Sequence, residues 1–282
     1  MGDFSADWLA LRAPADARAR SQELIERTLA WLSATRDADA PLTIADLGAG
    51  SGATVRALAP VLHEAGYTAQ HWLLLDADAD LLAHAANALS TLVPGLRVTP
   101  VQLDLAATPT GWPTRPDLVT CSAFFDLVSQ NWVDRFCATL AGDGHALLAF
   151  LTYSGTLTLS PPHAHDAAMV DAFNAHQRTD KGFGAALGPD AAGAVAHALT
   201  NAGYDVAQRR SDWALAAPED ARLIAEVLDG WAGAALELQA TDGTSPSGDA
   251  GLTAQAITAW RAARTDTSAM TVSHLDLLAL PR

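Results

Sequence analysis

The sequence predicts an α/β fold in which a mostly parallel sheet lies between layers of helices. Two observations predict it: short apolar runs alternate with amphipathic helical segments, and a glycine-rich turn joins the first strand to the next helix. Strands that alternate with helices form parallel sheets through right-handed crossovers. The predicted strands span 42–47, 71–76, 96–103, 117–122, 144–152, 204–215 and 271–280. The predicted helices span 15–35, 53–65, 79–92, 130–141, 166–177, 189–202, 219–239 and 252–264.

The glycine-rich turn is Asp46-Leu47-Gly48-Ala49-Gly50-Ser51-Gly52. Its three glycines let the backbone turn sharply and approach a ligand, and the following helix N-terminus favours a negatively charged group. Gly48-x-Gly50-x-x-Ala53 also fits the loose dinucleotide fingerprint, so the glycines alone allow NAD or FAD. The carboxylate of Asp46 beneath the turn instead favours a positively charged ligand.

Polar residues follow the next three predicted strands. Asp76 ends the second strand, Asp104 ends the third and Ser122 ends the fourth. In a doubly wound sheet, a carboxylate at the position of Asp76 accepts hydrogen bonds from ribose hydroxyls. Each acid by itself could be an ordinary turn residue at a strand end. Successive strand ends in one motif order indicate a nucleotide-type site.

Together these motifs, over about residues 42–153, resemble the Rossmann-like (class I) S-adenosylmethionine (SAM) methyltransferases. The resemblance implies a three-layer sandwich with a seven-stranded, mostly parallel sheet, extra helices and an antiparallel last strand at 271–280. It implies that SAM is the cofactor, that Asp104 accepts from the adenine amino group and that the Leu105 backbone lies beside the ring. Trp72 and Trp112 would border the adenine side. The implied cofactor-binding residues are Asp46, Gly48, Ala49, Gly50, Ser51, Gly52, Asp76, Ala77, Asp104, Leu105 and Ser122.

Composition narrows the class of protein. With 50% hydrophobic and 17% charged residues the chain of 282 residues is globular, not disordered. A net charge of −15 without a cluster of basic residues argues against nucleic acid as a partner. Two cysteines give no disulfide framework or metal-thiolate spacing. The sequence shows neither a signal peptide nor an apolar run of the roughly 20 residues that span a membrane, so the cytoplasm is expected.

The predicted organisation is a helical segment at 1–40 followed by a methyltransferase domain at 41–282. Within that domain, a helical insertion at about 155–188 follows the fifth strand. It would lie at the carboxyl edge of the sheet, where ligands bind in this architecture. The loop 241–249, rich in glycine, serine and proline, is expected to be flexible.

Two candidate residues for acceptor binding and catalysis follow the fourth strand. Phe125 should floor the acceptor pocket, and Asp126 could act as a base or bind a cation, although it could equally start a helix. Past the fifth strand, Tyr153 could close the pocket or simply pack.

The insertion carries a basic run. His176, Arg178 and Lys181, the only lysine of the chain, would suit an acceptor carboxylate or phosphate, the alternative being a solvated loop. His176 could serve as the general base, because its ordinary pKa lies near neutrality. Arg18 or Arg20 could meet the cofactor's carboxylate, although a solvated helix face is simpler.

We therefore expect a SAM-dependent methyltransferase that acts on a small molecule, without a bound metal. The basic run would suit an anionic acceptor. His163-x-His165-Asp166 has metal-ligand types but no partnering cluster. Two alternatives remain open: an NAD(P)-dependent oxidoreductase that uses the same glycine loop, and a SAM-binding protein without catalysis. Neither a nucleic acid nor a membrane is expected as a partner, and the sequence carries no signal for the oligomeric state.

Overall fold

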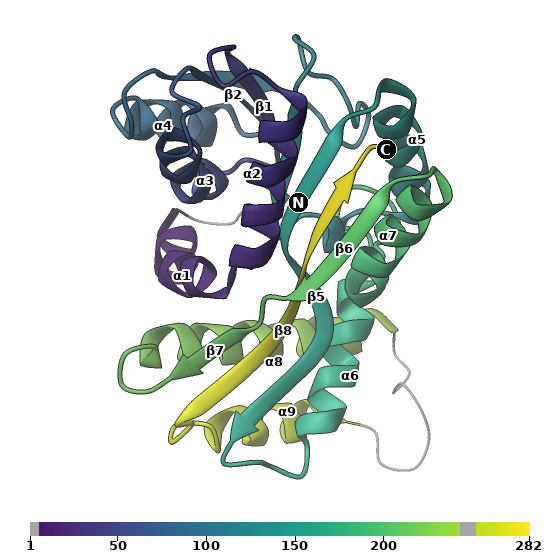
Figure 1. The fold of residues 1–282 in the computed structure, drawn as a ribbon. Coiled ribbons are helices and arrows are strands. Elements are labelled where there is room, and N and C mark those ends of the chain that lie inside the picture. Colours follow the sequence, from purple (N-terminus) through teal and green to yellow (C-terminus); the bar gives the residue numbers. More distant parts are fainter. Residues whose placement is uncertain (1–5, 243–251) are drawn as a thin grey trace.

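The computed structural model describes residues 6–242 and 252–282, and within them one sheet of eight strands runs through the molecule (Figure 1). Its order is β3-β2-β1-β4-β5-β8-β6, and β7 also pairs with β8. Strands β1 to β5 are parallel, whereas β8 is antiparallel to β5, β6 and β7. The strands are β1 (Leu42–Leu47), β2 (Gln70–Asp76), β3 (Leu96–Gln102), β4 (Leu118–Ser122), β5 (Ala146–Ser160), β6 (Asp205–Arg210), β7 (Trp213–Ala216) and β8 (Ala269–Leu280).

Helices cover both faces of the sheet, as the sandwich prediction requires. The described helices are α1 (Ala6–Ala19), α2 (Gln22–Thr35), α3 (Ala53–Glu64), α4 (Ala79–Leu89), α5 (Gln130–Asp143), α6 (Asp166–Gln177), α7 (Ala191–Asn201), α8 (Ala221–Asp242) and α9 (Ala254–Ala262). Short 3-10 turns lie at Phe125–Leu127 and Gly188–Asp190. Helices α2, α3 and α4 pack on one face, and α5 and α7 pack on the other.

Two hydrophobic cores result from the alternation of side chains along the strands. Ile44 of β1 faces the core under α2 and α3, whereas its neighbours Ala45 and Leu47 face the core under α5. Successive side chains of a strand point to opposite faces, so a strand covered on both sides is apolar throughout. All six residues of β1 are buried except Thr43, which is half-buried.

The prediction of seven strands was wrong by one, because the run 204–215 is not continuous. It is interrupted at Ser211 and Asp212, between β6 and β7. There the Ser211 amide donates to the His274 carbonyl (3.0 Å), while Asp212 Oδ1 accepts from the His274 amide (3.1 Å). The long β8 therefore pairs with β6 along one half and with β7 along the other.

A lower lobe contains much of what the sequence suggested as an insertion. Strand β5 does not end near residue 152 but continues to Ser160 beside β8. Helices α6, α8 and α9 cover this extension and build a third hydrophobic core around Trp231, Ile257 and Trp260. The first residues of the expected insertion thus prolong the central sheet.

The predicted N-terminal helix 15–35 is two helices. Helix α1 ends at Ala19, and Ser21 caps α2 by accepting a hydrogen bond from the Leu24 amide (3.3 Å). Serine is a favoured residue at this cap position. The break lets α1 turn away from α2 and contact β7, at the middle height of the molecule in Figure 1. Of the predicted loop 241–249, residues 241–242 form the end of α8, and residues 243–249 lie outside the described residues.

Candidate active site

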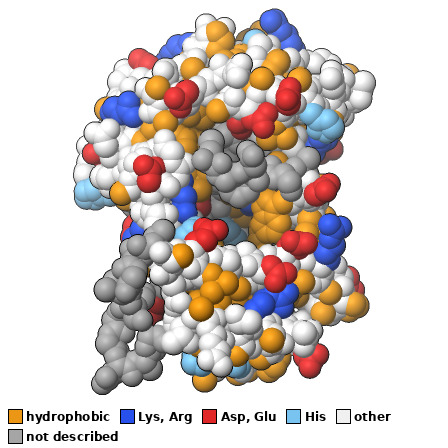
Figure 2. Space-filling view, turned by 180° about the vertical axis from the view of Figure 1, so that it is seen from behind, with side chains coloured by type: hydrophobic (Ala, Val, Ile, Leu, Met, Phe, Trp, Pro, Cys, Tyr) orange, Lys and Arg blue, Asp and Glu red, His pale blue; other side chains and the backbone are white. Residues whose placement is uncertain are grey.

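A cavity of about 690 Å³ lies at the carboxyl ends of β1, β2 and β4. A volume of this size is ordinary for a small-molecule or cofactor site. Figure 2 shows the molecule hollowed between its upper part and its lower lobe, with acidic side chains around the hollow. The cavity is lined by Leu9, Arg12, Asp16, Gly48, Ala49, Gly50, Ser51, Ala53, Thr54, Asp76, Ala77, Asp78, Asp80, Leu81, His84, Ser122, Ala123, Phe124 and Leu127.

The glycine turn has the backbone that only glycine adopts freely. Gly48, Gly50 and Gly52 have φ angles of 58°, 51° and 79°. A Cβ atom on Gly48 would lie 2.7 Å from the Phe124 ring, and one on Gly52 would lie 2.5 Å from Leu89. Strain and lack of space therefore both exclude side chains there. Gly52 precedes α3 without a side-chain cap, so the first amides of that helix face the cavity region.

Asp46 lies behind this turn at the end of β1 and is only 1% exposed. Its Oδ1 accepts from the Thr120 hydroxyl (2.8 Å), but its Oδ2 is buried without a hydrogen-bond partner. Burial raises the pKa of Asp46 to about 6, although Thr120, Thr54 and the Arg20 charge act in the opposite direction. Asp46 is not among the lining residues, so it would act on a ligand through its field rather than by contact.

Asp76 lines the cavity at the end of β2 and also fixes the turn. Its Oδ2 accepts from the Gly50 amide (3.0 Å), and its Oδ1 accepts from the Asp78 amide (3.1 Å). Each carboxylate oxygen can accept more than one hydrogen bond, so capacity remains for hydroxyl donors. Asp78 caps α4 by accepting from the amides of Asp80 and Leu81. The acids at this end of the cavity are thus held in place by backbone donors.

Of the other predicted cofactor residues, two line the cavity and two do not. Ala77 and Ser122 line the cavity, whereas Asp104 and Leu105 do not. Asp104 is exposed and accepts from the Ala106 amide (2.9 Å), and the Leu105 carbonyl accepts from Trp132 Nε1 (2.6 Å). Their proposed contacts with an adenine ring stay predictions.

Two tryptophans expected beside the cofactor lie elsewhere. Trp72 is fully buried in the core between the sheet and α3, because its position in β2 points to that face. Trp112 packs edge to face on His145, with ring centroids 5.3 Å apart. That contact is at the amino-terminal end of β5, away from the cavity.

Three cavity residues that the sequence analysis missed come from α1: Leu9, Arg12 and Asp16. Arg12 binds Asp16 through Nε (3.0 Å) and Nη2 (3.2 Å), and its guanidinium lies 4.9 Å from the centre of the Trp213 ring. Asp16 also accepts from Trp213 Nε1 (2.9 Å). The i, i+4 spacing of Arg12 and Asp16 was visible in the sequence, but nothing in it placed α1 over the glycine turn.

Arg18 and Arg20 do not line the cavity. Arg18 is exposed and pairs with Asp220 (2.7 Å) on the surface. Arg20 is buried under Phe150, with the charges of Asp16 and Asp276 nearby, and burial lowers its pKa from the usual arginine value. Arg12, six residues before Arg18 on α1, lines the cavity instead.

Asp126 lies two residues beyond the cavity-lining Phe124 and is buried, with Oδ1 unpartnered. Burial raises its pKa to about 6, while the charges of Arg12 and Lys181 partly counter this. The Asp126 charge in turn contributes to the raised pKa of Tyr153, after burial as the main cause. The charges of Arg12 on α1 and Lys181 in the loop after α6 thus act on this carboxyl, and its own charge acts on Tyr153 of β5.

The three basic residues at and after the end of α6 do not lie together: two contact each other, and the third pairs at the surface. Lys181 Nζ lies 3.4 Å from His176 Nδ1, while His176 Nε2 lies 3.1 Å from Glu237. Burial and the Lys181 charge lower the pKa of His176. Arg178 instead forms an exposed ion pair with Asp190 (2.9 Å). Half-buried Lys181 thus contacts His176 and its charge acts on the Asp126 carboxyl, whereas Arg178 pairs with Asp190 at the surface.

The segment after α6 is folded onto the core next to the cavity. Asp180 Oδ1 accepts from the amides of Gly182 (2.7 Å) and Gly184 (3.0 Å), which shapes a compact turn. At its tip Phe183 packs edge to face on Phe124, with ring centroids 5.6 Å apart. Phe125, predicted as the floor of the acceptor pocket, is 1% exposed and packs on Trp132. Phe125 therefore packs in the core next to Phe124 and does not line the cavity.

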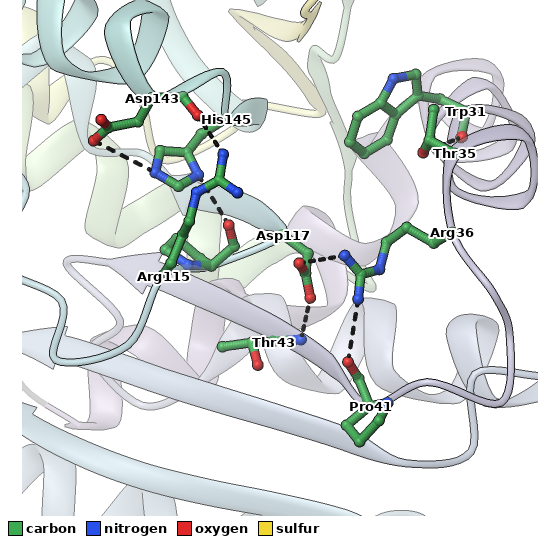
Figure 3. Close-up of polar contacts among 10 residues, drawn as sticks. Trp31, Thr35, Arg36, Pro41, Thr43, Arg115, Asp117, Asp143 and His145 are labelled. Carbon is green, nitrogen blue, oxygen red and sulfur yellow. Dashed lines mark hydrogen bonds and ion pairs between the residues drawn. The ribbon is translucent and has the colours of Figure 1, made fainter.

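A second, smaller hollow of about 170 Å³ lies at the opposite, amino-terminal ends of β1, β4 and β5 (Figure 3). Arg36 pairs with Asp117, whose Oδ2 accepts from the Thr43 amide (2.8 Å). Arg115 donates to the Asp143 carbonyl, and His145 Nδ1 lies 2.9 Å from the Pro116 carbonyl. The contacts in this hollow are thus made within the protein, and they tie the strand starts together.

The described residues hold no group of three or more histidine, cysteine, aspartate or glutamate side chains arranged to bind a metal. His163 and His165 pack on each other, and Asp166 instead pairs with Arg264 and accepts from Trp260 Nε1 (2.8 Å). Among the same described residues, no helix combines the length and apolarity needed to cross a membrane.

The sequence matches no protein-family model, and it matches no curated protein. Among solved structures, the chain is similar to the cyclopropane synthase MmaA2 from Mycobacterium tuberculosis, with 14% identity and a TM-score of 0.49 over 98% of this chain and 95% of that one. It is also similar to a SAM-dependent methyltransferase from Geobacter sulfurreducens in complex with S-adenosyl-L-homocysteine, with 15% identity and a TM-score of 0.44 over 100% of both chains.

The strand order itself defines the fold. Five parallel strands in the order β3-β2-β1-β4-β5, followed by the antiparallel β8 inserted before β6, form a Rossmann-like sheet of the class I methyltransferase type. A dehydrogenase sheet lacks this antiparallel strand. The structure thus confirms the predicted fold class, with β7 as an addition.

Proposed function

We propose that this protein is a SAM-dependent methyltransferase that acts on a small-molecule acceptor. The observation that carries the proposal is the buried Asp46 carboxyl behind a glycine turn that faces a large cavity. A negative charge at this point repels a diphosphate and attracts a positively charged sulfonium ligand. It therefore favours SAM over NAD, although both suit the glycine turn.

The residues around the cavity fit SAM. Asp76 at the end of β2 is placed to accept from ribose hydroxyls, and the backbone of Gly48 to Ser51 forms a wall that a ligand can approach closely. The unpartnered Oδ2 of Asp46 leaves negative charge uncompensated behind that wall. When bound, SAM would supply a methyl group on a positively charged sulfur, which needs little covalent help from the protein.

For the acceptor, we propose that Asp126 holds or removes the proton of the attacking group at its unpartnered Oδ1. A carboxyl with a pKa of about 6 is mostly ionised at neutral pH yet still basic enough for this role. The Lys181 charge favours the ionised form of Asp126, and the Asp126 charge acts on Tyr153, whose hydroxyl donates to Asn174 (2.8 Å). The Lys181 charge supports an acceptor with an anionic group. His176, already engaged by Glu237, is the weaker choice of base.

Two further parts of the proposal concern organisation and location. We propose that the segment at about 155–188 supplies the acceptor side of the site, because its loop packs through Phe183 onto Phe124. We also propose that residues 1–40 form an N-terminal helical segment that precedes a methyltransferase domain at 41–282. The cytoplasm is the proposed location, and neither a nucleic acid nor a membrane is the proposed partner.

Isothermal titration with SAM, S-adenosylhomocysteine and NAD tests the choice of cofactor. We expect heats of binding for the two sulfur compounds and none for NAD. Binding of NAD without binding of SAM would establish the oxidoreductase alternative and refute the methyltransferase.

A second experiment separates an enzyme from a binding protein that uses the same site. The protein is incubated with methyl-labelled SAM and a small-molecule extract, and the label is followed by chromatography. We expect label in a small molecule, and we expect Asp126→Asn to slow its appearance while SAM affinity is kept. SAM binding without any transfer in extracts of several kinds would favour a non-catalytic binding protein.

A further inference from the structure

The cavity has a polar pair at one end that no predicted role accounts for. Arg12 and Asp16 project from the same side of α1, one helical turn apart, and both line the cavity. Their side chains are only 12% and 6% exposed, so they are not an ordinary surface ion pair. A positive and a negative group at one cavity wall suit a ligand that carries one negative and one positive group.

The pair is held rigidly. Trp213 contacts both members of the pair: its Nε1 donates to Asp16 (2.9 Å), and its ring lies against the Arg12 guanidinium. Arg12 uses Nε and Nη2 to bind Asp16, and among the described residues its Nη1 has no hydrogen-bond partner. A guanidinium presents its donors as a planar fork that suits a carboxylate. Arg12 can therefore bind a carboxylate without giving up Asp16.

The position of the pair indicates which part of a ligand it meets. Asp76 at the end of β2 marks the ribose end of the cavity, and the ligand would cross the glycine turn of β1 towards β4. Arg12 lies towards that far end, because its guanidinium is 4.9 Å from the centre of the Trp213 ring on β7, and β7 pairs with β8, which lies beyond β4 and β5 in the sheet. The far end of SAM is its amino-acid group, with one ammonium and one carboxylate.

We propose that Arg12 and Asp16 bind the amino-acid end of the cofactor, Arg12 taking the α-carboxylate and Asp16 the α-ammonium. This inference rests on the proposed function, and it makes α1 a part of the cofactor site. The pair selects sulfur ligands that keep their amino-acid end and discriminates against those that lack it. The specificity for the amino-acid end of the ligand then comes from one turn of α1, outside the glycine motif.

Titrations of matched ligands test the pair. S-adenosylhomocysteine carries the amino-acid end, and 5′-methylthioadenosine lacks it but keeps the adenosine and sulfur. For Arg12→Met we expect the affinity for S-adenosylhomocysteine to fall about 10- to 100-fold, the range for losing a charged hydrogen-bond pair. The affinity for 5′-methylthioadenosine should change by less than about threefold. Arg12→Lys keeps the charge without the fork and should give an intermediate loss.

Arg18→Met is the matched control, because Arg18 lies on the same helix but pairs with Asp220 at the surface. It should leave both affinities unchanged, and thermal melting should show all three variants folded. An equal loss for both ligands in Arg12→Met, or no loss for either, would overturn the role of the pair. If the unmodified protein binds neither ligand, the proposed function itself fails, which is a different result.

Discussion

At the scale of single residues, the site depends on a carboxyl that is costly to bury. Asp46 is almost wholly inaccessible, and only one of its oxygens has a hydrogen-bond partner. Desolvation disfavours its charged form, which is why its pKa rises to about 6. A group whose environment works against the stability of the fold is often explained by a ligand that it serves.

The Asp46 pKa gives a prediction with a definite sign. Below about pH 3 the carboxyl is protonated in both the folded and the unfolded chain. As the pH rises to about 6 the unfolded chain loses this proton while the folded protein keeps it, so the free energy of unfolding falls. The total loss attributable to Asp46 is about 3 kcal/mol, from a shift of about two pH units.

Urea unfolding of the protein and of Asp46→Asn, measured from pH 3 to pH 7.5, checks this. The neutral amide cannot ionise, so the variant should become more stable relative to the unchanged protein across this range, by about 3 kcal/mol. Asp126 titrates in both proteins and cancels in the difference. Parallel curves for the two proteins would mean that Asp46 ionises at its ordinary pKa.

At the scale of elements, Asp276 joins three parts of the fold that are distant in sequence. It is fully buried on β8. Its Oδ2 accepts from the Ser21 amide between α1 and α2, and its Oδ1 accepts from the Leu151 amide in β5, both at 2.7 Å. Leu151 has a φ angle of 56° at an irregularity in the β5–β8 pairing. One side chain thus fixes the strand irregularity and the turn that directs α1 over the cavity.

Replacing Asp276 by Asn should therefore destabilise the protein. The amide has one acceptor oxygen, so one of the two backbone donors loses its partner in a buried place. We expect the free energy of unfolding to fall by about 1–3 kcal/mol, measured by urea denaturation. Asp266→Asn, at an exposed position shortly before β8, should stay within about 0.5 kcal/mol. Equal effects of the two substitutions would show that Asp276 does not anchor the α1–α2 turn.

At the scale of the whole molecule, the lower lobe shares its strands with the central sheet. Strands β5 and β8 run through both, so the third core around Trp231 and Trp260 is built on the same strands as the first two. Continuous strands couple the two halves mechanically, since neither can lose its pairing without exposing the other. The lobe should therefore unfold together with the rest.

Ile257→Ala tests this coupling. Ile257 is fully buried in the lobe, and its truncation should cost about 2–5 kcal/mol. We expect calorimetry to show one transition, shifted to lower temperature, with the neighbouring exposed Thr258→Ala nearly unchanged. A separate low-temperature transition, with the main transition in place, would mean that the lobe folds independently.

Much of the architecture could be predicted from sequence because it depends on local patterns. The apolar runs of β1 and β2 and the glycine turn between β1 and α3 follow from side-chain periodicity and from backbone freedom. The break at Ser211 could not be predicted in this way, because it is set by the pairing of Asp212 with the His274 amide on a distant strand. The full length of β5 has the same origin, since β8 alongside it determines where it ends.

The sequence by itself determined the sheet of alternating strands, the glycine turn and the carboxyls of Asp46 and Asp76 at the strand ends, because each depends on neighbours along the chain. Only the tertiary structure decided which distant side chains join them. Folding of α1 over the turn brings in Arg12 and Asp16, and the loop after α6 lets the Lys181 charge act on Asp126 while Arg178 pairs with Asp190 at the surface. These contacts depend on how elements pack, and packing depends on the whole chain at once.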